Sequence, residues 1–100
     1  MGKLTGKTAL ITGASKGIGE GIARVFAKHG ANLVLAARGS ETQALAQSLC
    51  ESGAKAIAVK MDVSDMASVQ AGYETAVQEF GGVDILAVSY THLLRRVSQP

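Results

Sequence analysis

The sequence predicts an α/β fold in which four strands of a parallel sheet alternate with three helices. Three observations lead to this prediction. Short apolar runs alternate with longer segments of helical periodicity. Glycines stand where the helices are expected to end. The connections are short, as in right-handed crossovers between parallel strands. With 47% hydrophobic and 18% charged residues, the 100-residue chain has the composition of one globular domain.

The first two strands are predicted from apolar runs without strict alternation, a pattern typical of strands buried on both faces. They are TALIT at residues 8–12 and ANLVLAA at residues 31–37. Between them, apolar residues at helical spacing predict a helix, and Gly30 supplies its left-handed stop. The residues with this spacing are Ile18, Ile22, Val25, Phe26 and His29.

A second helix is predicted directly after the second strand. Ser40 and Gln43 have the spacing of a capping box, which satisfies backbone groups at a helix start. The helix is expected to end at Ser52 and Gly53. Cys50, near its end, is expected to be a small buried hydrophobic residue.

The rest of the predicted sheet follows the same rhythm. The third strand is predicted from the alternation of Ile57, Val59 and Met61. Ser64 is expected to cap a third helix, which two glycines at positions 81 and 82 would stop. The run VDILAV, residues 83–88, is predicted as the fourth strand.

Composition argues against several classes of function. The formal net charge is +2 and the basic residues are scattered, so neither nucleic acid nor a membrane surface is expected as a partner. A single cysteine excludes an internal disulfide and a cysteine-rich metal site, and no metal site is expected. The start MGKLTGK lacks the apolar stretch of a signal peptide, and no segment has the roughly 18 apolar residues of a membrane span. We therefore expect a cytoplasmic protein.

A glycine-rich stretch, TGASKGIG at residues 12–19, joins the first strand to the first helix. Its spacing, G-x-x-x-G-x-G, matches neither the G-x-G-x-x-G fingerprint nor the P-loop. A glycine turn at this place exposes backbone N–H groups and the positive end of the helix dipole, so it suits a phosphate group. The alternative is a loop that only connects the strand to the helix.

This stretch closely resembles the cofactor motif of the short-chain dehydrogenase/reductase family, whose members use NAD(H) or NADP(H). The resemblance implies a Rossmann-type, doubly wound parallel sheet, here truncated, with strand order 3-2-1-4. In the family the first glycine makes the turn, the second admits the pyrophosphate, and the third packs the helix on the strand. The resemblance assigns cofactor binding to Thr12, Gly13, Ser15, Lys16, Gly17, Ile18 and Gly19.

The implied strand order has two consequences for the shape of the molecule. The first two crossovers place their helices on one face of the sheet, and the third places its helix on the other. One face is therefore expected to be thinly covered. The fourth strand is expected to be an open edge.

The residue after the second strand bears on the choice of cofactor. NAD-binding folds place a carboxylate at the end of this strand to bind the ribose 2′-hydroxyl, whereas a 2′-phosphate requires positive charge. The strand ends in Ala37 and is followed by Arg38, and Lys16 is a second cation that can reach the same phosphate. We expect NADP(H) to be preferred, with NAD(H) possible. The alternative is that both cations are solvated surface charges.

A further match to the family follows the third strand. There the family has an aspartate and an apolar residue that contact the adenine ring, and Asp62 and Val63 fit this place. A carboxylate can accept from the exocyclic amine while Val63 covers the ring. The alternative is that Asp62, Ser64 and Asp65 are only turn and capping residues.

The resemblance covers residues 4 to about 86. The family continues with Asn-Asn-Ala-Gly, but this chain has AVSYTHLLRRVSQP, and residues 87–100 are expected to be a non-family tail, disordered or foreign to the gene. The family's catalytic Tyr-x-x-x-Lys pair is absent, because the fourth residue after Tyr90 is Leu94. No catalytic residue is therefore predicted, and residues 1–86 are interpreted as an NADP-binding half-domain.

Together these features predict the N-terminal cofactor-binding part of an NADP(H)-dependent short-chain oxidoreductase. The parent enzyme would transfer hydride between nicotinamide and a carbonyl or alcohol, and the 100-residue chain would be catalytically incomplete. The resemblance also implies a small-molecule carbonyl or alcohol substrate and a homo-oligomeric parent. The alternatives are a non-catalytic NADP(H)-binding module and an inactive fragment.

Overall fold

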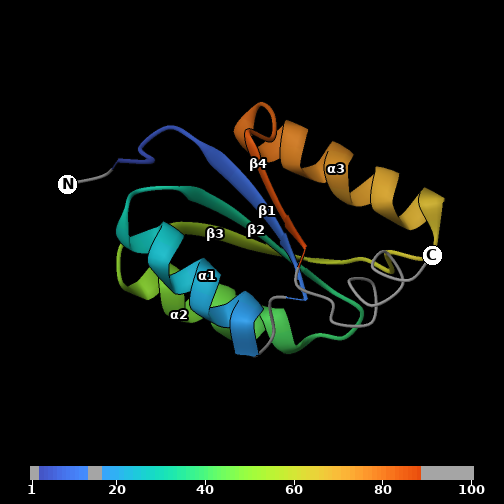
Figure 1. Cartoon of the computed structure of the whole chain (residues 1–100), viewed down its shortest axis with the longest axis horizontal. Coiled ribbons are helices and arrows are strands. Elements are labelled where there is room, and N and C mark those ends of the chain that lie inside the picture. Colours follow the sequence, from blue (N-terminus) through green and yellow to red (C-terminus); the bar gives the residue numbers. More distant parts are fainter. Residues whose placement is uncertain (1–2, 14–16, 89–100) are drawn as a thin grey trace, which may run out of the picture.

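The computed structural model describes residues 3–13 and 17–88 and contains a four-stranded parallel sheet with three helices (Figure 1). The strand order is β3-β2-β1-β4, with every neighbouring pair parallel. The predicted α/β class and strand order are thus confirmed. The elements are β1 (Thr8–Thr12), α1 (Gly17–Lys28), β2 (Asn32–Ala37), α2 (Glu41–Glu51), β3 (Lys55–Lys60), α3 (Met66–Phe80) and β4 (Ile85–Val88).

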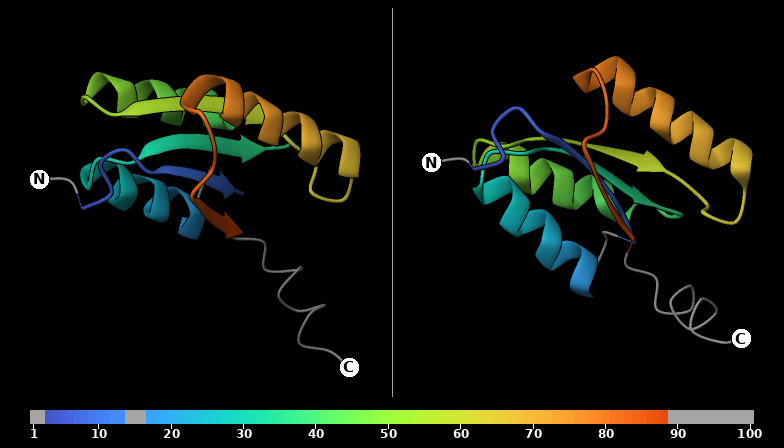
Figure 2. Two further views of the ribbon diagram at one scale, coloured as in Figure 1. Left: turned by 90° about the horizontal axis from the view of Figure 1, so that it is seen from above. Right: turned by 45° about the horizontal axis from the view of Figure 1, so that its top comes forward.

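The helices lie on the two faces of the sheet as the crossover rule predicts. Helices α1 and α2 cover one face, and α3 lies alone on the other (Figures 1 and 2). Successive strand residues point to opposite faces, so Ile11 and Leu33 belong to the core on the α1 and α2 side. Leu10 and Val34 belong to the core on the α3 side.

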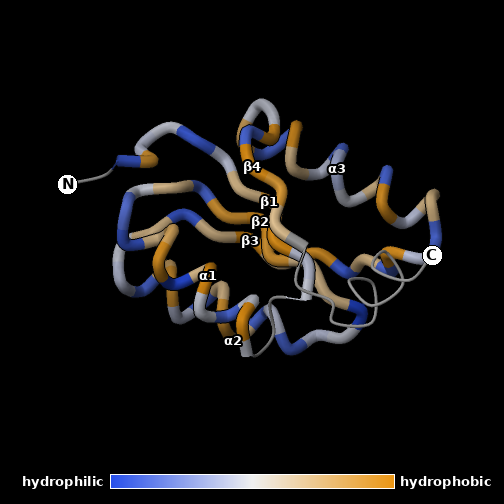
Figure 3. The backbone as a smooth tube through the Cα atoms, in the orientation of Figure 1, coloured by the Kyte–Doolittle hydropathy of each residue, from blue (hydrophilic) through white to orange (hydrophobic). Residues whose placement is uncertain are grey.

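The two central strands are the most buried part of the molecule. Every residue of β1 is buried, and so is every residue of β2 after Asn32. Figure 3 shows hydrophobic residues concentrated on the strands, whereas polar and apolar residues alternate along the helices. The continuous apolar runs in the sequence therefore mark strands covered on both faces.

Strand β4 is joined to the start of β1 by a pair of hydrogen bonds. The backbone N–H of Thr8 donates to Oδ2 of Asp84 at 2.9 Å. The backbone N–H of Asp84 donates to the carbonyl of Thr8 at 2.8 Å. The strand then pairs with β1 through Ala87 and Val88, beyond the boundary expected at residue 86.

The second helix begins directly after Ser40 as predicted, but the two predictions about capping side chains are wrong. Ser40 precedes α2, but its backbone (φ −99°, ψ 9°) is not extended, and its side chain makes no capping hydrogen bond. The N-cap of α3 is Asp65, whose Oδ1 accepts from the N–H of Ala67 at 3.0 Å. Ser64 does not cap that helix, because its hydroxyl instead donates to Asp62 at 2.7 Å.

Some residues expected in the core are exposed. Cys50 is exposed on α2, although its thiol lies 3.2 Å from the carbonyl of Ala56. On α1, Ile22 and Phe26 pack against the core, but Val25 and Ile18 face solvent. The apolar stripe of this helix is therefore narrower than its sequence spacing predicts.

The α3 face of the sheet carries an apolar groove of about 690 Å³. Met66 and Tyr73 of α3 line one side of it, and Leu86 of β4 lines the other. Met66 is 78% exposed and Leu86 is 64% exposed. In the described part of the chain this face is therefore thinly covered, and β4 is an edge strand.

Candidate cofactor-binding site

The predicted site residues lie along one edge of the sheet. Strands β1, β2 and β3 are parallel, so their carboxyl ends meet at the same edge. Ala36 pairs with Thr12, and Ala37 pairs with Lys60. Gly13, Arg38 and Asp62 follow the ends of these strands. Ligands of open α/β sheets bind outside this edge.

The start of α1 leaves open space for a ligand. Gly13 and Gly17 have φ values of +64° and +65°, in the left-handed region where side chains are strained. Apart from its chain neighbours, no atom of the described residues lies within 4 Å of the position that a Cβ on Gly17 would take. Packing against the described residues therefore does not explain why position 17 is a glycine. The space beside the helix N-terminus can instead accept an anion.

The other residues of the motif differ in their surroundings. Gly19 is buried in the first turn of α1, whereas Ile18 beside it is 75% exposed. Thr12 is buried, and its hydroxyl lies 3.5 Å from the carbonyl of Ala87, which joins the ends of β1 and β4. Ser15 and Lys16 lie outside the described residues.

Arg38 and Asp62 lie at a common cavity. It has a volume of about 310 Å³ and lies at the carboxyl ends of β2 and β3. Two cationic side chains and one carboxylate surround it, and both cations are exposed. Its lining residues are Arg38, Lys60, Met61, Asp62 and Ser68.

Asp62 is held in place by its own turn. Its Oδ1 accepts hydrogen bonds from the hydroxyl of Ser64 at 2.7 Å and from the N–H of Ser64 at 3.0 Å. These bonds, with a smaller contribution from the nearby Arg38 guanidinium, lower the pKa of the Asp62 carboxyl below its ordinary value. The carboxylate is therefore ionised at neutral pH and can accept a further hydrogen bond.

Val63 lies at a different cavity from Asp62. It is half-buried and packs against the core on the α3 side. It also lines the apolar groove between α3 and β4. The structure thus places Arg38 and Asp62 at one cavity and Val63 at its neighbour.

Two lining residues were not predicted from the sequence. Lys60 is the last residue of β3, and its place directly before Met61 and Asp62 at a strand end is a signal that could have identified it. Ser68 accepts a hydrogen bond from the N–H of Asp62 at 2.9 Å. No sequence pattern connects Ser68 to the strand end, because it lies in the first turn of α3.

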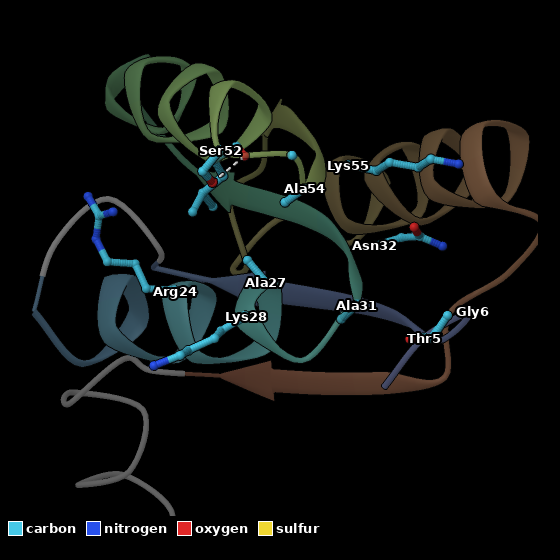
Figure 4. A pocket seen from close by; sticks show the side chains of 13 residues that line it. Thr5, Gly6, Arg24, Ala27, Lys28, Ala31, Asn32, Ser52, Ala54 and Lys55 are labelled. Carbon is cyan, nitrogen blue, oxygen red and sulfur yellow. Dashed lines mark hydrogen bonds between the residues drawn. The ribbon is translucent and has the colours of Figure 1, made fainter. Parts of the chain in front are cut away.

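A larger cavity, of about 740 Å³, lies at the opposite edge of the sheet (Figure 4). It is lined by the last turns of α1 and α2, where helix carbonyls present partial negative charge that disfavours phosphate. Its cations include Lys28, Lys55 and Arg24, the last of which pairs with Glu20 at 2.9 Å. The carboxyl edge is therefore the better candidate for a phosphate-bearing ligand.

No group of three or more His, Cys, Asp or Glu side chains in residues 3–13 and 17–88 is arranged to hold a metal ion. None of the helices in that part of the chain has both the length and the apolar character needed to cross a membrane.

Comparison with known proteins connects this geometry to a family. The family model described as short chain dehydrogenase matches residues 7–93. The chain belongs to the short-chain dehydrogenase family. The match extends past residue 86, while the expected division of the chain at that residue stays a prediction.

Individual relatives agree with this assignment. Oxidoreductase UcpA of Salmonella typhimurium is 62% identical over 86 residues, which are 86% of this chain and 33% of that protein. The chain thus spans about a third of the length of this relative. A short-chain dehydrogenase/reductase structure from Burkholderia phymatum, in complex with NAD, has a TM-score of 0.81 and 39% identity over 86% of this chain and 31% of that one. A short-chain type structure from Mycobacterium marinum has a TM-score of 0.79 and 40% identity over 83% and 33%.

Proposed function

We propose that residues 1–86 form the NADP(H)-binding part of a short-chain oxidoreductase that interconverts a carbonyl and an alcohol. The observation that carries this proposal is the open space at the N-terminus of α1, where a Cβ on Gly17 would meet no atom of the described residues within 4 Å, its chain neighbours aside. Pyrophosphate fits this space, because helix N-terminal N–H groups and the helix dipole both favour an anion.

The adenosine half of the cofactor fits the neighbouring cavity. Arg38 follows Ala37, so no carboxylate at the end of β2 would repel a 2′-phosphate, and the Arg38 guanidinium can bind it. Asp62 is ionised and its Oδ1 is engaged by Ser64, so its Oδ2 would accept the hydrogen bond from the exocyclic amine of adenine.

The cofactor, when bound, would supply the hydride-carrying nicotinamide ring. The described residues bind and orient it. Gly13 would make the turn, Gly17 would admit the pyrophosphate, and the buried Gly19 would let α1 pack closely on the strand, while Arg38 with Asp62 would hold the adenosine. The relative from Salmonella is named an oxidoreductase, which supports the reaction class, and the Burkholderia structure contains NAD. Since that structure contains NAD and the proposal for this chain is NADP(H), the two cofactors are compared directly in the following test.

The test compares NADPH and NADH binding to the full chain and to Arg38→Asp by isothermal titration calorimetry. The substitution removes a charge-assisted contact and adds a repulsive carboxylate, so NADPH should bind about 10- to 100-fold more weakly while NADH binding is retained. Lys55→Asp is the matched control, because it makes the same charge change at the opposite edge of the sheet. Equal loss of both cofactors in Arg38→Asp would contradict the phosphate assignment.

A further inference from the structure

We propose that Lys60 is a second specificity-determining cation for the 2′-phosphate of NADP(H), acting from β3 beside Arg38 of the β2 end. This inference rests on the proposed function and deepens it, since it concerns the same cavity. It assigns a role to a residue outside the glycine motif and outside the Asp62–Val63 pair.

The placement of Lys60 follows from strand register. Lys60 pairs with Ala37, the residue directly before Arg38. Neighbouring strands lie about 4.8 Å apart, so two long basic side chains that start from these positions can reach the same ligand group. Both residues line the same cavity of about 310 Å³.

The charges around this cavity favour a dianion. Asp62 is the acidic residue in its lining, and its Oδ1 is already engaged by Ser64. Within residues 3–13 and 17–88 the recorded ion pair is Arg24 with Glu20, so neither Lys60 nor Arg38 is neutralised by a carboxylate within 4 Å. A phosphate monoester carries close to two negative charges near neutral pH, which two such cations can balance.

Binding measurements can tell a lysine that is only solvated at the end of a strand from a lysine that contacts the 2′-phosphate. Removal of a surface charge changes the affinity for every anionic nucleotide through the same weak, screened field. Removal of a direct contact changes the affinity only for the nucleotide that carries the contacted phosphate. The two roles are therefore separated by comparing nucleotides with and without the 2′-phosphate.

The experiment measures binding of 2′,5′-ADP and 5′-AMP to the full chain by calorimetry. In Lys60→Gln the affinity for 2′,5′-ADP should fall by about tenfold, and that for 5′-AMP should stay within about twofold. Lys60→Arg should restore most of the 2′,5′-ADP affinity, because it returns the charge. Lys55→Gln removes a lysine from the other end of the same strand and should change neither affinity.

Two results would overturn the inference. One is an unchanged affinity of Lys60→Gln for 2′,5′-ADP, and the other is an equal loss for both nucleotides. The Arg38→Gln variant shows whether only the role of Lys60 is wrong or the proposed cofactor site as a whole. If Arg38→Gln loses 2′,5′-ADP binding and Lys60→Gln does not, only the role of Lys60 is wrong. If the unmodified chain binds neither nucleotide, both proposals are wrong.

Discussion

Asp62 has a structural role in the turn after β3, and a single oxygen, Oδ1, accepts both of its hydrogen bonds from Ser64. Ser64 donates two hydrogen bonds to Oδ1, and Ser68 accepts one from the Asp62 backbone. These bonds fix the carboxylate at the strand end and favour its charged form. The capping interpretation of Asp62 and the adenine interpretation are therefore compatible, because they use different oxygens.

Replacement of Ser64 by alanine tests this arrangement. The pKa of Asp62 should rise toward its ordinary value, because the largest cause of its depression is the Ser64 hydroxyl. A depressed pKa stabilises the fold above the unfolded-state pKa, and this contribution is lost as the pH falls through the folded-state pKa. Ser64→Ala should thus be less stable than the unmodified chain at neutral pH, and the difference should shrink in acid.

Carboxyl ¹³C titration by NMR gives the pKa directly, and urea unfolding at neutral and acid pH gives the stability. Ser48→Ala, a change on the surface of α2, serves as the control and should leave Asp62 unaffected. An unchanged Asp62 pKa in Ser64→Ala would show that the hydrogen bond does not control the carboxylate.

The positions of some residues at the candidate site could be predicted from the sequence, and those of others could not. Arg38 and Asp62 were predictable, since each follows the end of a recognisable strand. The capping role of Ser64 was not, because Ser64 and Asp65 are both good capping residues and only the turn geometry assigns Ser64 to Asp62. Lys60 was missed because a lysine has no motif of its own, although its place just before Asp62 at the end of the third strand could have identified it.

Two glycines, one within α1 and one directly after α3, differ in whether their backbone conformation requires glycine. Gly21 lies within α1, and a Cβ there would meet no atom within 4 Å. Gly81 ends α3 with φ +88°, and its N–H donates to the carbonyl of Val77. The first glycine only weakens its helix, whereas the second provides the left-handed cap.

Alanine substitutions at the two positions should therefore have opposite signs. Gly21→Ala should stabilise the fold by about 0.8–1 kcal/mol, the difference in helix propensity. Gly81→Ala should destabilise it by about 1–2 kcal/mol, because alanine is strained in the left-handed region. Urea unfolding followed by circular dichroism measures both. A neutral or stabilising effect of Gly81→Ala would show that the backbone at Gly81 is not held left-handed, and a destabilising Gly21→Ala would contradict the helix-propensity argument.

At the scale of elements, strand existence was easier to predict than strand ends. Burial on both faces makes β1 and β2 continuous apolar runs, and these were predicted almost to the residue. The fourth strand was predicted from residue 83 but begins at Ile85, and Asp84 just before it bonds the start of β1 through its side chain and its backbone. A side-chain hydrogen bond between two elements that are distant in the sequence leaves no local sequence pattern that could predict it.

For the whole molecule, the strand topology determines where the candidate site lies and which face of the sheet is thinly covered. Parallel strands bring Gly13, Arg38 and Asp62 to one edge although 49 positions separate the first from the last in sequence. The same crossovers leave α3 alone on its face, beside the apolar groove and the edge strand β4 (Figure 2). Crossover handedness made this predictable from the order of the elements.

A crystal structure of the full chain grown with saturating NADPH would show whether the carboxyl edge of the sheet binds the cofactor. The pyrophosphate should lie against the N–H groups at the start of α1, with adenine beside Asp62 and the 2′-phosphate beside Arg38. Electron density for the nucleotide in the cavity lined by Lys28 and Lys55 at the opposite edge would contradict it. So would an ordered helix N-terminus with no nucleotide beside it.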